Sequence, residues 1–388
     1  MHPFDVIMLN MSSYAEWLHG VNNRNYHVLD ELVRSSDVRS ILAVDYPPLT
    51  FKRALRNYKE NVLMSLPEGK VRYRSLTERL TEISDKLSVY SNCTFYKSPE
   101  RFMQRIKAVA ERLEFRDMVV WSFFPPAMKH TGSLGQRLTV FDAVDNWAEH
   151  SSYRQFVPML KENYTYIKEK ADIIFTVADE LQKLIDNQPN AYWIPNGVDL
   201  AHYQTPRRLI NRDIADIPRP IVGYIGIIQD RVDVDMIVEL ARMNPNKSFV
   251  MVGPVWSDRD KQRLETQENI HVLGYKSYDE APAYIQQFDV ALIPHKTSPF
   301  ITSTNPMKVY EYLACGKPVV ASRQSGAEMF EDAVYLASDA AEFHSSIGRA
   351  LAEDSSEKQL MRRDAVREYS WSNTVSQMLM IVKKKLTY

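Results

Sequence analysis

Two kinds of segment alternate along almost the whole chain of 388 residues, and this alternation limits the fold more than any other feature. Short apolar or β-branched runs, such as residues 5–9 and 221–225, are followed by longer amphipathic stretches, such as residues 25–33 and 101–113. Buried parallel strands joined by helices have this pattern. The sequence therefore predicts an α/β fold with doubly wound parallel sheets.

The expected strands fall into two groups, separated by the polar, proline-containing segment 203–219, which has no sustained period. A single hydrophobic core stops growing at about 250 to 300 residues, so two domains are expected. We expect a first domain at 1–202, a linker at 203–219, a second domain at 220–370 and a C-terminal helix at 371–388. The predicted strands are 5–9, 40–44, 118–121, 139–141, 172–177, 192–194, 221–225, 248–252, 270–273, 290–293, 318–321 and 333–336.

The C-terminal segment 371–388 has the spacing of an amphipathic helix. Its predicted apolar side carries Val375, Met378, Met380 and Val382. We expect this helix to cross back to the first domain. The three lysines near its end suit the negative end of a helix dipole, and a membrane or partner contact is the alternative.

Composition excludes several classes of function. With 48 basic and 49 acidic residues the net charge is -1, so no general attraction to nucleic acid is expected. Cys93 and Cys315 lie far apart and lack the spacing of a zinc or redox pair, which predicts reduced thiols. The apolar run at the N-terminus is too short for a signal peptide or a membrane span, so we expect a cytoplasmic protein.

The most informative stretch, residues 301–322, follows an apolar strand and opens a helix. Asn305 is the predicted N-cap of this helix and Pro306 its first residue. Such a helix directs free backbone N–H groups and a positive dipole end into the crevice at the carboxyl edge of the sheet. A diphosphate fits there.

Side chains around this helix start have the chemistry of a nucleotide site. Ser303 and Thr304 would supply hydroxyl donors, and Lys308 places a positive charge where it opposes the dipole unless an anion binds. Lys308 and Glu311 share a helix face, and a surface ion pair is the plain interpretation. In the functional interpretation, Glu311 accepts hydrogen bonds from the two ribose hydroxyls.

Residues 308–321 resemble the donor-site signature of GT-B glycosyltransferases, specifically glycosyltransferase family 4 and the bacterial teichuronic acid and capsule enzymes near it. In that family a glutamate precedes an A-x-G-x-P-V-V segment, and here Glu311 precedes residues 314–320. Weaker marks occur in the correct order at 172–181, 194–199, 221–226, 249–253 and 272–275.

The resemblance implies two Rossmann-like domains that face each other across a cleft, with the donor site in the second. It implies transfer of a sugar from a nucleoside diphosphate sugar, with UDP expected, to a saccharide or lipid-linked acceptor in cell-surface polysaccharide synthesis. Retention at the anomeric carbon is also implied. No D-x-D motif stands at a suitable strand end, so we expect no metal ion, and no cofactor beyond the nucleotide sugar.

Two departures from the family pattern change the expected site. The first glutamate of the family's E-x(7)-E pair is replaced by Ser303. The identity of the donor sugar therefore cannot be inferred from other members of the family. The glycine loop at Gly226 is followed by Arg231 alone, instead of a basic pair. Phosphate binding therefore depends on Arg231, Lys308 and helix N–H groups, and these two cations are the candidate catalytic residues of this domain.

Two further residues are assigned to the donor site. Tyr275 lies in a loop that packs against the nucleobase in similar enzymes, and a simple turn is the alternative. His295 follows a strand near the donor loop. It is a candidate contact to the sugar or phosphate, and a structural histidine is the alternative.

The acceptor site is expected in the first domain. After the strand at 139–141, Asp145 could orient or deprotonate the acceptor hydroxyl, and Trp147 could stack on a sugar face. Alternatively, Asp145 caps the turn and Trp147 packs internally. Trp17 and Arg24, which follow the first strand, are candidates for a saccharide or pyrophosphate-linked acceptor, and a helix surface is the other interpretation.

Residues 52–79 contain eight basic and three acidic residues, interleaved with aromatic ones. Such a face could rest on an anionic bilayer at the inner face of the plasma membrane. A solvated basic surface is the alternative.

Two other functions remain open at this level. A non-hydrolysing nucleotide-sugar epimerase shares the two-domain architecture and would need no acceptor. A degenerate transferase could act as a binding or scaffold subunit in a polysaccharide assembly complex, with no turnover.

Overall fold

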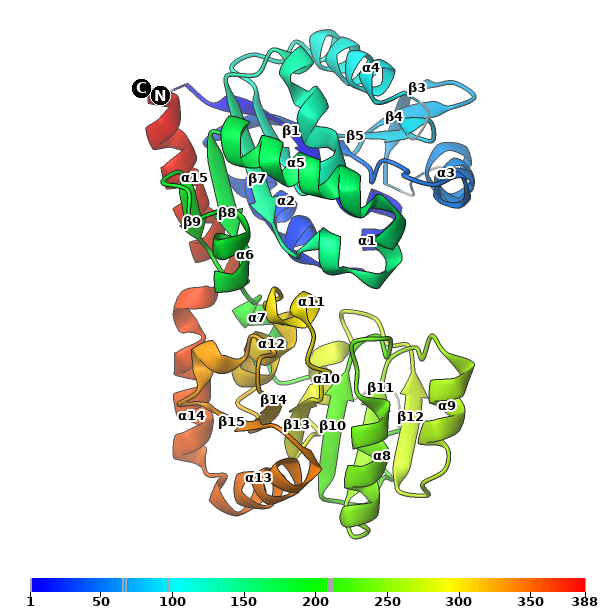
Figure 1. The fold of residues 1–388 in the computed structure, drawn as a ribbon, viewed down its shortest axis with the longest axis vertical. Coiled ribbons are helices and arrows are strands. Elements are labelled where there is room, and N and C mark those ends of the chain that lie inside the picture. Colours follow the sequence, from blue (N-terminus) through cyan, green and yellow to red (C-terminus); the bar gives the residue numbers. More distant parts are fainter. Residues whose placement is uncertain (1, 65, 67, 96–97, 208–212, 388) are drawn as a thin grey trace. The chain divides into compact units, whose positions relative to one another are not determined.

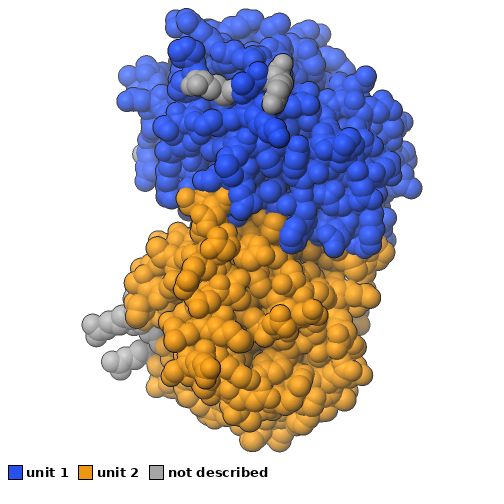
Figure 2. Space-filling view, turned by 90° about the vertical axis from the view of Figure 1, so that its left-hand side faces the viewer, with its two compact units in different colours: residues 1–194, 374–388 blue, residues 195–373 orange. Residues whose placement is uncertain are grey.

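The computed structural model describes residues 2–64, 66, 68–95, 98–207 and 213–387. The chain divides into two compact units (Figures 1 and 2). Unit 1 comprises Met1–Ile194 and Thr374–Tyr388, and unit 2 comprises Pro195–Asn373. Each unit contains its own sheet, which confirms the predicted pair of α/β domains.

Unit 1 is built on a 9-stranded sheet with the order β3-β4-β5-β2-β1-β6-β7-β8-β9. Its strands are β1 Phe4–Leu9, β2 Val38–Val44, β3 Lys70–Arg74, β4 Glu78–Glu82, β5 Leu87–Asn92, β6 Val119–Ser122, β7 Leu138–Ala143, β8 Ile173–Thr176 and β9 Ala191–Trp193. Its helices include α1 Tyr14–Leu18, α2 Arg24–Arg34, α3 Phe51–Asn57, the π-helix η1 Tyr58–Leu63, α4 Pro99–Arg112, α5 Val157–Lys170 and α6 Asp179–Leu184.

Every predicted strand of unit 1 is present to within two residues, but β3, β4 and β5 were not predicted. These strands form the antiparallel edge of a sheet that is otherwise parallel. All of β3 is exposed to solvent. An exposed strand carries no apolar pattern, so periodicity cannot predict it.

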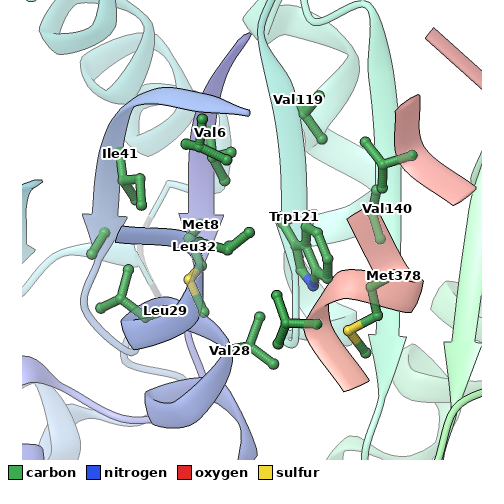
Figure 3. Close-up of a cluster of buried hydrophobic side chains, with 14 of the residues drawn as sticks. Val6, Met8, Val28, Leu29, Leu32, Ile41, Val119, Trp121, Val140 and Met378 are labelled. Atoms are coloured by element: carbon green, nitrogen blue, oxygen red, sulfur yellow. The ribbon is translucent and has the colours of Figure 1, made fainter. Parts of the chain in front are cut away.

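One face of this sheet packs against α2 and against the C-terminal helix, α15 (Trp371–Thr387). Figure 3 shows Met8 and Trp121 on the strands, Leu29 on α2 and Met378 on α15 within a single apolar cluster. The end of the chain is therefore part of the core of unit 1.

The predicted apolar side of α15 is correct at three positions and wrong at one. Val375, Met378 and Val382 are buried, whereas Met380 is 64% exposed. The buried positions are separated by three or four residues and so share one helix face. Position 380 lies off that face, which explains the exception.

Unit 2 is built on a 6-stranded sheet with the order β12-β11-β10-β13-β14-β15, and all of its strand pairs are parallel. Its strands are β10 Ile221–Ile225, β11 Ser248–Val252, β12 Ile270–Gly274, β13 Val290–Ile293, β14 Val319–Ser322 and β15 Val334–Ala337. Its helices include α7 Leu200–Gln204, α8 Val234–Met243, α9 Asp258–Leu264, α10 Ala281–Ile285, α11 Pro299–Thr302, α12 Met307–Ala314, α13 Ala340–Glu353 and α14 Ser356–Ala365. Apolar clusters cover both faces of the sheet, as in a doubly wound fold.

The boundary between the units differs from the prediction, which placed it after residue 202. Unit 2 already begins at Pro195. Asn196 explains this difference, because its side-chain amide donates to the carbonyl oxygen of Asn305 in unit 2 at 2.6 Å. This bond ties residues 195–202 to unit 2.

The predicted linker, 203–219, also packs within unit 2 where it is described. Tyr203 and Ile214 are 3% and 1% exposed and belong to the core of that unit. Residues 208–212 of the predicted linker lie outside the described residues. The prolines and polar residues of this segment indicated irregular structure, but irregular structure can still be anchored in a core.

Candidate functional site

The sheet of unit 2 reverses its strand order between β10 and β13. The chain runs from β10 to β11 on one side, and from β13 to β14 on the other (Figure 1). Ligands of open α/β sheets bind at the carboxyl ends of the two strands that flank such a point. Gly226 directly follows β10, and His295 lies two residues beyond β13.

Two glycines allow the backbone to approach closely at this point. Gly226 has a φ of +136°, and a Cβ atom there would lie 2.6 Å from the Nζ atom of Lys308. Gly253 has a φ of +137°, and its Cβ would lie 2.1 Å from the carbonyl oxygen of Gly226. Both positions therefore require glycine, and the amine of Lys308 occupies the space that Gly226 leaves.

Lys308 is the second residue of α12, and its Nζ atom lies 5.6 Å from the centre of the Tyr224 ring. Its side chain is half-buried. Burial lowers the pKa of Lys308 to about 8; the nearby positive charge of Arg231 also lowers this pKa, and the carboxylate of Glu311 opposes the change. A bound anion would therefore favour the charged form of Lys308.

The start of α12 differs from the prediction. The helix begins at Met307, and Pro306 is its N-cap, without a side-chain cap bond. Asn305 does not cap the helix, because its Oδ1 atom accepts hydrogen bonds from the backbone N–H of Asn196 at 2.9 Å and from the hydroxyl of Tyr310 at 2.8 Å. The first-turn N–H groups thus have no side-chain cap and are open to an anion.

The two predicted hydroxyl donors are engaged locally. Ser303 donates its hydroxyl to the carbonyl of Phe300 at 2.7 Å, and Thr304 donates to the carbonyl of Ile301 at 2.8 Å. Serine and threonine commonly form such bonds to a carbonyl three residues earlier. The prediction that these hydroxyls point at a ligand as donors is wrong for the conformation described.

His295 is the most unusual polar residue of this site. It is 4% exposed, and neither ring nitrogen has a hydrogen-bond partner in the described part of the chain. Burial holds the pKa of His295 well below its ordinary value, and the positive charges of Lys308 and Arg231 lower it further. The imidazole is therefore neutral, and a buried neutral imidazole without a partner indicates a missing ligand.

Arg231 supplies the second cation from the loop after β10. Its backbone carbonyl accepts from the N–H of Lys296 at 2.9 Å, and Val232 forms a β-bridge with His295. With the Gln229 amide turned to present its oxygen, that oxygen accepts from Arg231 Nη2 at 3.0 Å. The backbone thus fixes Arg231 beside His295, and both act electrostatically with Lys308 on α12.

Glu311 lies one helical turn after Lys308 and is half-buried. Burial raises the pKa of Glu311, while the charge of Lys308 and a hydrogen bond from the hydroxyl of Tyr203 lower it. Tyr203 therefore orients this carboxylate. The other predicted contact, Tyr275, directly follows β12 and is 58% exposed.

The aromatic acceptor candidates of unit 1 are core residues. Trp147 is 4% exposed and stacks on Tyr153, with ring centres 4.6 Å apart. Trp17 is 5% exposed, and its indole N–H donates to the hydroxyl of Ser12 at 2.8 Å. The prediction that they present an open face to a sugar is therefore wrong, and internal packing, the alternative weighed for Trp147, is correct.

Arg24 is also buried and forms an ion pair with Asp142, at 2.9 Å between Nε and Oδ1. Both side chains are fully buried. Since removing one partner of a buried pair leaves an uncompensated charge, Arg24 has a structural role. The predicted acceptor contact and the helix surface given as its alternative both need an accessible side chain, and neither describes this residue. Asp145 is half-buried, and its backbone carbonyl accepts from the hydroxyl of Tyr164 at 3.2 Å.

Comparison with known proteins places most of this site in one family. Residues 219–353 match the family described as glycosyl transferases group 1. This span includes Gly226, His295, Lys308 and Glu311. The chain carries a glycosyl transferases group 1 domain. The predicted relationship to glycosyltransferases is thereby confirmed.

Relatives and solved structures extend the likeness beyond the group 1 domain. The candidate teichuronic acid biosynthesis glycosyltransferase TuaH of Bacillus subtilis (strain 168) is 28% identical over 274 residues, which is 65% of this chain and 68% of that protein. Sucrose-phosphate synthase from Thermosynechococcus elongatus aligns over 99% of both chains, with a TM-score of 0.75 and 16% identity. Anabaena HepE in complex with UDP and glucose aligns over 98% of this chain and 100% of that one, with a TM-score of 0.68 and 15% identity. These matches confirm the two-domain α/β fold of the GT-B type.

Two residues of the candidate donor site were not predicted. Gly253 ends β11 as Gly226 ends β10, and this repeated strand-to-glycine step was a signal available in the sequence. Tyr203 stands in the segment that was read as a linker, so no local pattern connected it with Glu311. Only the fold brings these two residues together.

Proposed function

We propose that this chain is a glycosyltransferase that moves a sugar from a nucleoside diphosphate sugar, with UDP as the nucleotide, to a saccharide or lipid-linked acceptor. The observation that carries the proposal is the meeting of Lys308, Arg231 and His295 at the switch point of the group 1 domain. Two cations and a buried neutral imidazole form a site whose charge an anion would balance. The names of HepE in complex with UDP and glucose, and of TuaH, support a UDP sugar and cell-surface polysaccharide synthesis.

Each proposed donor residue has a chemical task. Transfer breaks the bond between the anomeric carbon and the diphosphate oxygen, and the electron pair of that bond remains on the leaving phosphate. Lys308, Arg231 and the N–H groups at the start of α12 stabilise this negative charge more in the transition state than in the ground state. These groups need no metal ion for the task, so the proposal is metal-independent transfer, with retention at the anomeric carbon.

The nucleoside half of the donor is assigned to Glu311 and Tyr275. The hydroxyl of Tyr203 satisfies part of the Glu311 carboxylate and fixes its direction. The remaining lone pairs can accept both hydroxyls of a ribose. Tyr275, exposed at the end of β12, is proposed to pack against the base.

The acceptor is proposed to bind unit 1, with Asp145 orienting or deprotonating the hydroxyl that attacks. Asp145 lies two residues after β7 and is half-buried. A carboxylate at a strand end has the chemistry of a general base for a sugar hydroxyl. Its role is separable from the donor site, because the two residue sets belong to different units.

A contact between unit 1 and an anionic bilayer is also proposed, which would place this cytoplasmic protein at the inner face of the plasma membrane. Phe51, Met64 and Leu76 are 69%, 61% and 84% exposed, in a segment where Lys52 and Lys59 are exposed as well. Apolar side chains among lysines suit the boundary of an anionic membrane. Across the described residues, no helix is both long enough and apolar enough to span a bilayer.

The basic face expected at residues 52–79 is smaller than the sequence suggested. Arg53 forms two hydrogen bonds of 2.9 Å with Glu16, and Arg72 pairs with Glu82. Arg79 is buried. Residues 65 and 67 of this face lie outside the described residues. The bilayer contact thus depends on the exposed apolar side chains as much as on charge.

The donor proposal is tested by calorimetric titration of UDP in the presence of a chelator. The wild-type chain should bind UDP under these conditions. Gly226→Ala should weaken binding at least tenfold, because its Cβ would occupy the position of the Lys308 amine. Gly348→Ala, where the new Cβ meets nothing within 4 Å, is the matched control and should bind like the wild type.

Three results would contradict the proposal. They are no binding of UDP to the wild-type chain, loss of binding on addition of the chelator, and equal affinities of Gly226→Ala and Gly348→Ala.

A further inference from the structure

Four polar residues form a row across one face of the sheet of unit 1. In the strand register, Leu9 pairs with Val44 and Val44 with Tyr90, and backbone hydrogen bonds of 3.1 and 2.9 Å continue this ladder to the next residue of each strand. Residues that are paired across neighbouring strands point to the same face. The row therefore contains Asn10 after β1, Asp45 after β2, Ser91 on β5 and Arg79, which pairs with Ser91 from β4.

The side chains in the middle of the row have hydrogen-bond partners. Asp45 accepts hydrogen bonds from the N–H of Tyr14 at 2.7 Å and from the hydroxyl of Ser91 at 2.5 Å. Burial raises the pKa of Asp45 to about 6, against these two bonds and the charge of Arg79. Asp45 therefore carries its charge only with the support of these neighbours.

The side chains at the two ends of the row have no hydrogen-bond partners among the described residues. Arg79 is 1% exposed, and none of its three guanidinium nitrogens has a hydrogen-bond partner within the described ranges. Asn10 is fully buried, and neither its amide nitrogen nor its amide oxygen has a partner there. A buried polar group without a partner is costly, and a buried guanidinium is among the most costly. Two such groups on one face indicate an absent ligand.

The charge around Arg79 gives the sign of that ligand. The guanidinium is attracted by Asp45 and repelled by Arg74. Arg53 also acts on Asp45, but it is neutralised by Glu16 through two hydrogen bonds. Arg74 is exposed to solvent, so the sign of the ligand follows from the Arg79 guanidinium itself. Its N–H donors require acceptor oxygens, and an anionic group supplies the strongest ones.

We propose that Arg79 and Asn10 bind an anionic saccharide in unit 1, with a phosphate or carboxylate group on Arg79 and sugar hydroxyls on the Asn10 amide. A guanidinium binds either anion through two parallel hydrogen bonds, and an amide can donate to and accept from hydroxyls. Three strand spacings separate the two residues, about 14 Å between backbones, so a ligand that reaches both must span the row over Asp45 and Ser91. This inference rests on the proposed function, because it assigns the chemical class of the acceptor.

The site requires a moving cover. The π-helix η1 packs against β4 and β5, so it must shift to admit a ligand to Arg79. π-Helical turns are rare and frequently occur at functional sites. Asn57, before η1, and Asn61, on η1, each have a buried side-chain oxygen without a partner among the residues described. Such oxygens can accept from the hydroxyls of a sugar but not from its anionic group.

The test uses the full chain and calorimetric titration with glucose 6-phosphate and with glucuronate, with glucose as the neutral control. At least one anionic sugar should bind at least tenfold more tightly than glucose, as expected for hydrogen bonds assisted by charge. Arg79→Gln should remove this preference. Arg72→Gln, which changes an exposed arginine on the neighbouring strand, should retain it.

A second variant covers the case in which Arg79→Gln fails to fold. Asn10→Asp places a negative charge at the other end of the row and should weaken binding of the anionic sugar at least tenfold. Inorganic phosphate is titrated separately: binding as tight as that of glucose 6-phosphate would show a site for a free anion and would overturn the acceptor assignment.

The inference would also be overturned if neither anionic sugar bound better than glucose, or if both Arg79→Gln and Asn10→Asp bound like the wild type. UDP titrated into the same variants separates the two proposals. If UDP binds while the anionic sugars do not, only the acceptor inference fails. If UDP does not bind to the wild type, the proposed function fails as well.

Discussion

Raising the pH from 7 to 9 should weaken UDP binding about tenfold, because Lys308 loses its charge over this interval. Burial and the repulsion from Arg231 together outweigh Glu311 and lower the pKa of Lys308 to about 8. A bound diphosphate favours the charged amine and so raises this pKa again. Binding therefore takes up a proton, and affinity must fall as the pH rises through 8.

The magnitude follows from the charged fraction of Lys308 in the free protein. With a pKa of about 8, this fraction is about nine tenths at pH 7 and about one tenth at pH 9. When only the charged form binds, the apparent Kd is the intrinsic Kd divided by this fraction, which gives the tenfold change. A lysine with an ordinary pKa of about 10.4 would leave the apparent Kd for UDP almost unchanged between pH 7 and 9.

Calorimetry at both pH values, in two buffers with different enthalpies of protonation, measures the affinity and the proton uptake together. Lys308→Arg is the control, since a guanidinium stays charged at both pH values, and its pH dependence should vanish whatever its absolute affinity. A Kd that is unchanged between pH 7 and 9 in the wild type would refute the reasoning, as would an equal pH dependence in Lys308→Arg.

Three further predictions concern single residues. Glu311→Gln should weaken UDP binding at least tenfold by removing charge-assisted acceptance, but should barely affect a 2′,3′-dideoxyribose analogue; penalties that add in a calorimetric cycle would exclude a ribose contact. For His295→Gln, the thermal midpoint should fall less between pH 7 and 5.5 than it does in the wild type. The pKa of His295 is lowered by folding, so the unfolded chain binds more protons below about pH 6.5 and stability is lost as the pH falls; parallel pH curves for both proteins would contradict this. Asp145→Asn should reduce sugar transfer and leave UDP affinity unchanged, and an equal loss of both would remove Asp145 from the acceptor side.

Most strands of the two sheets could be predicted from the sequence, because buried parallel strands appear in it as short apolar runs. β10, β11 and β13 coincide with predicted apolar runs to the residue. The exposed edge strand β3 leaves none, since a strand at a solvated edge needs no apolar face. β4 and β5 are buried, but polar residues such as Thr81 and Ser91 interrupt their apolar runs. Arg79 and Ser91 lie on these unpredicted strands, so their row with Asp45 could not be inferred.

For the site, sequence patterns assign residues along the chain but do not show which of them are buried. Lys308 and Gly226 were both assigned to the donor site, and the structure brings them together. Trp17, Arg24 and Trp147 are assigned to the acceptor from their residue types and their places after strands of the first domain. Aromatic and basic side chains suit both a binding surface and a satisfied core, and only the packing of the folded chain separates these cases.

The pKa shifts of Lys308 and His295 have the same causes, burial first and mutual repulsion of positive charges second. Lys308 and His295 are both shifted toward their neutral forms, so the free protein already reduces this repulsion by giving up protons. An anion would reverse both shifts, so its binding free energy includes the relief of this repulsion. Ligand binding stabilises the unit that contains the site by about 2.7 kcal/mol at one hundred times its Kd. A diphosphate should therefore protect unit 2 against unfolding, while protection of unit 1 would require a ligand of its own.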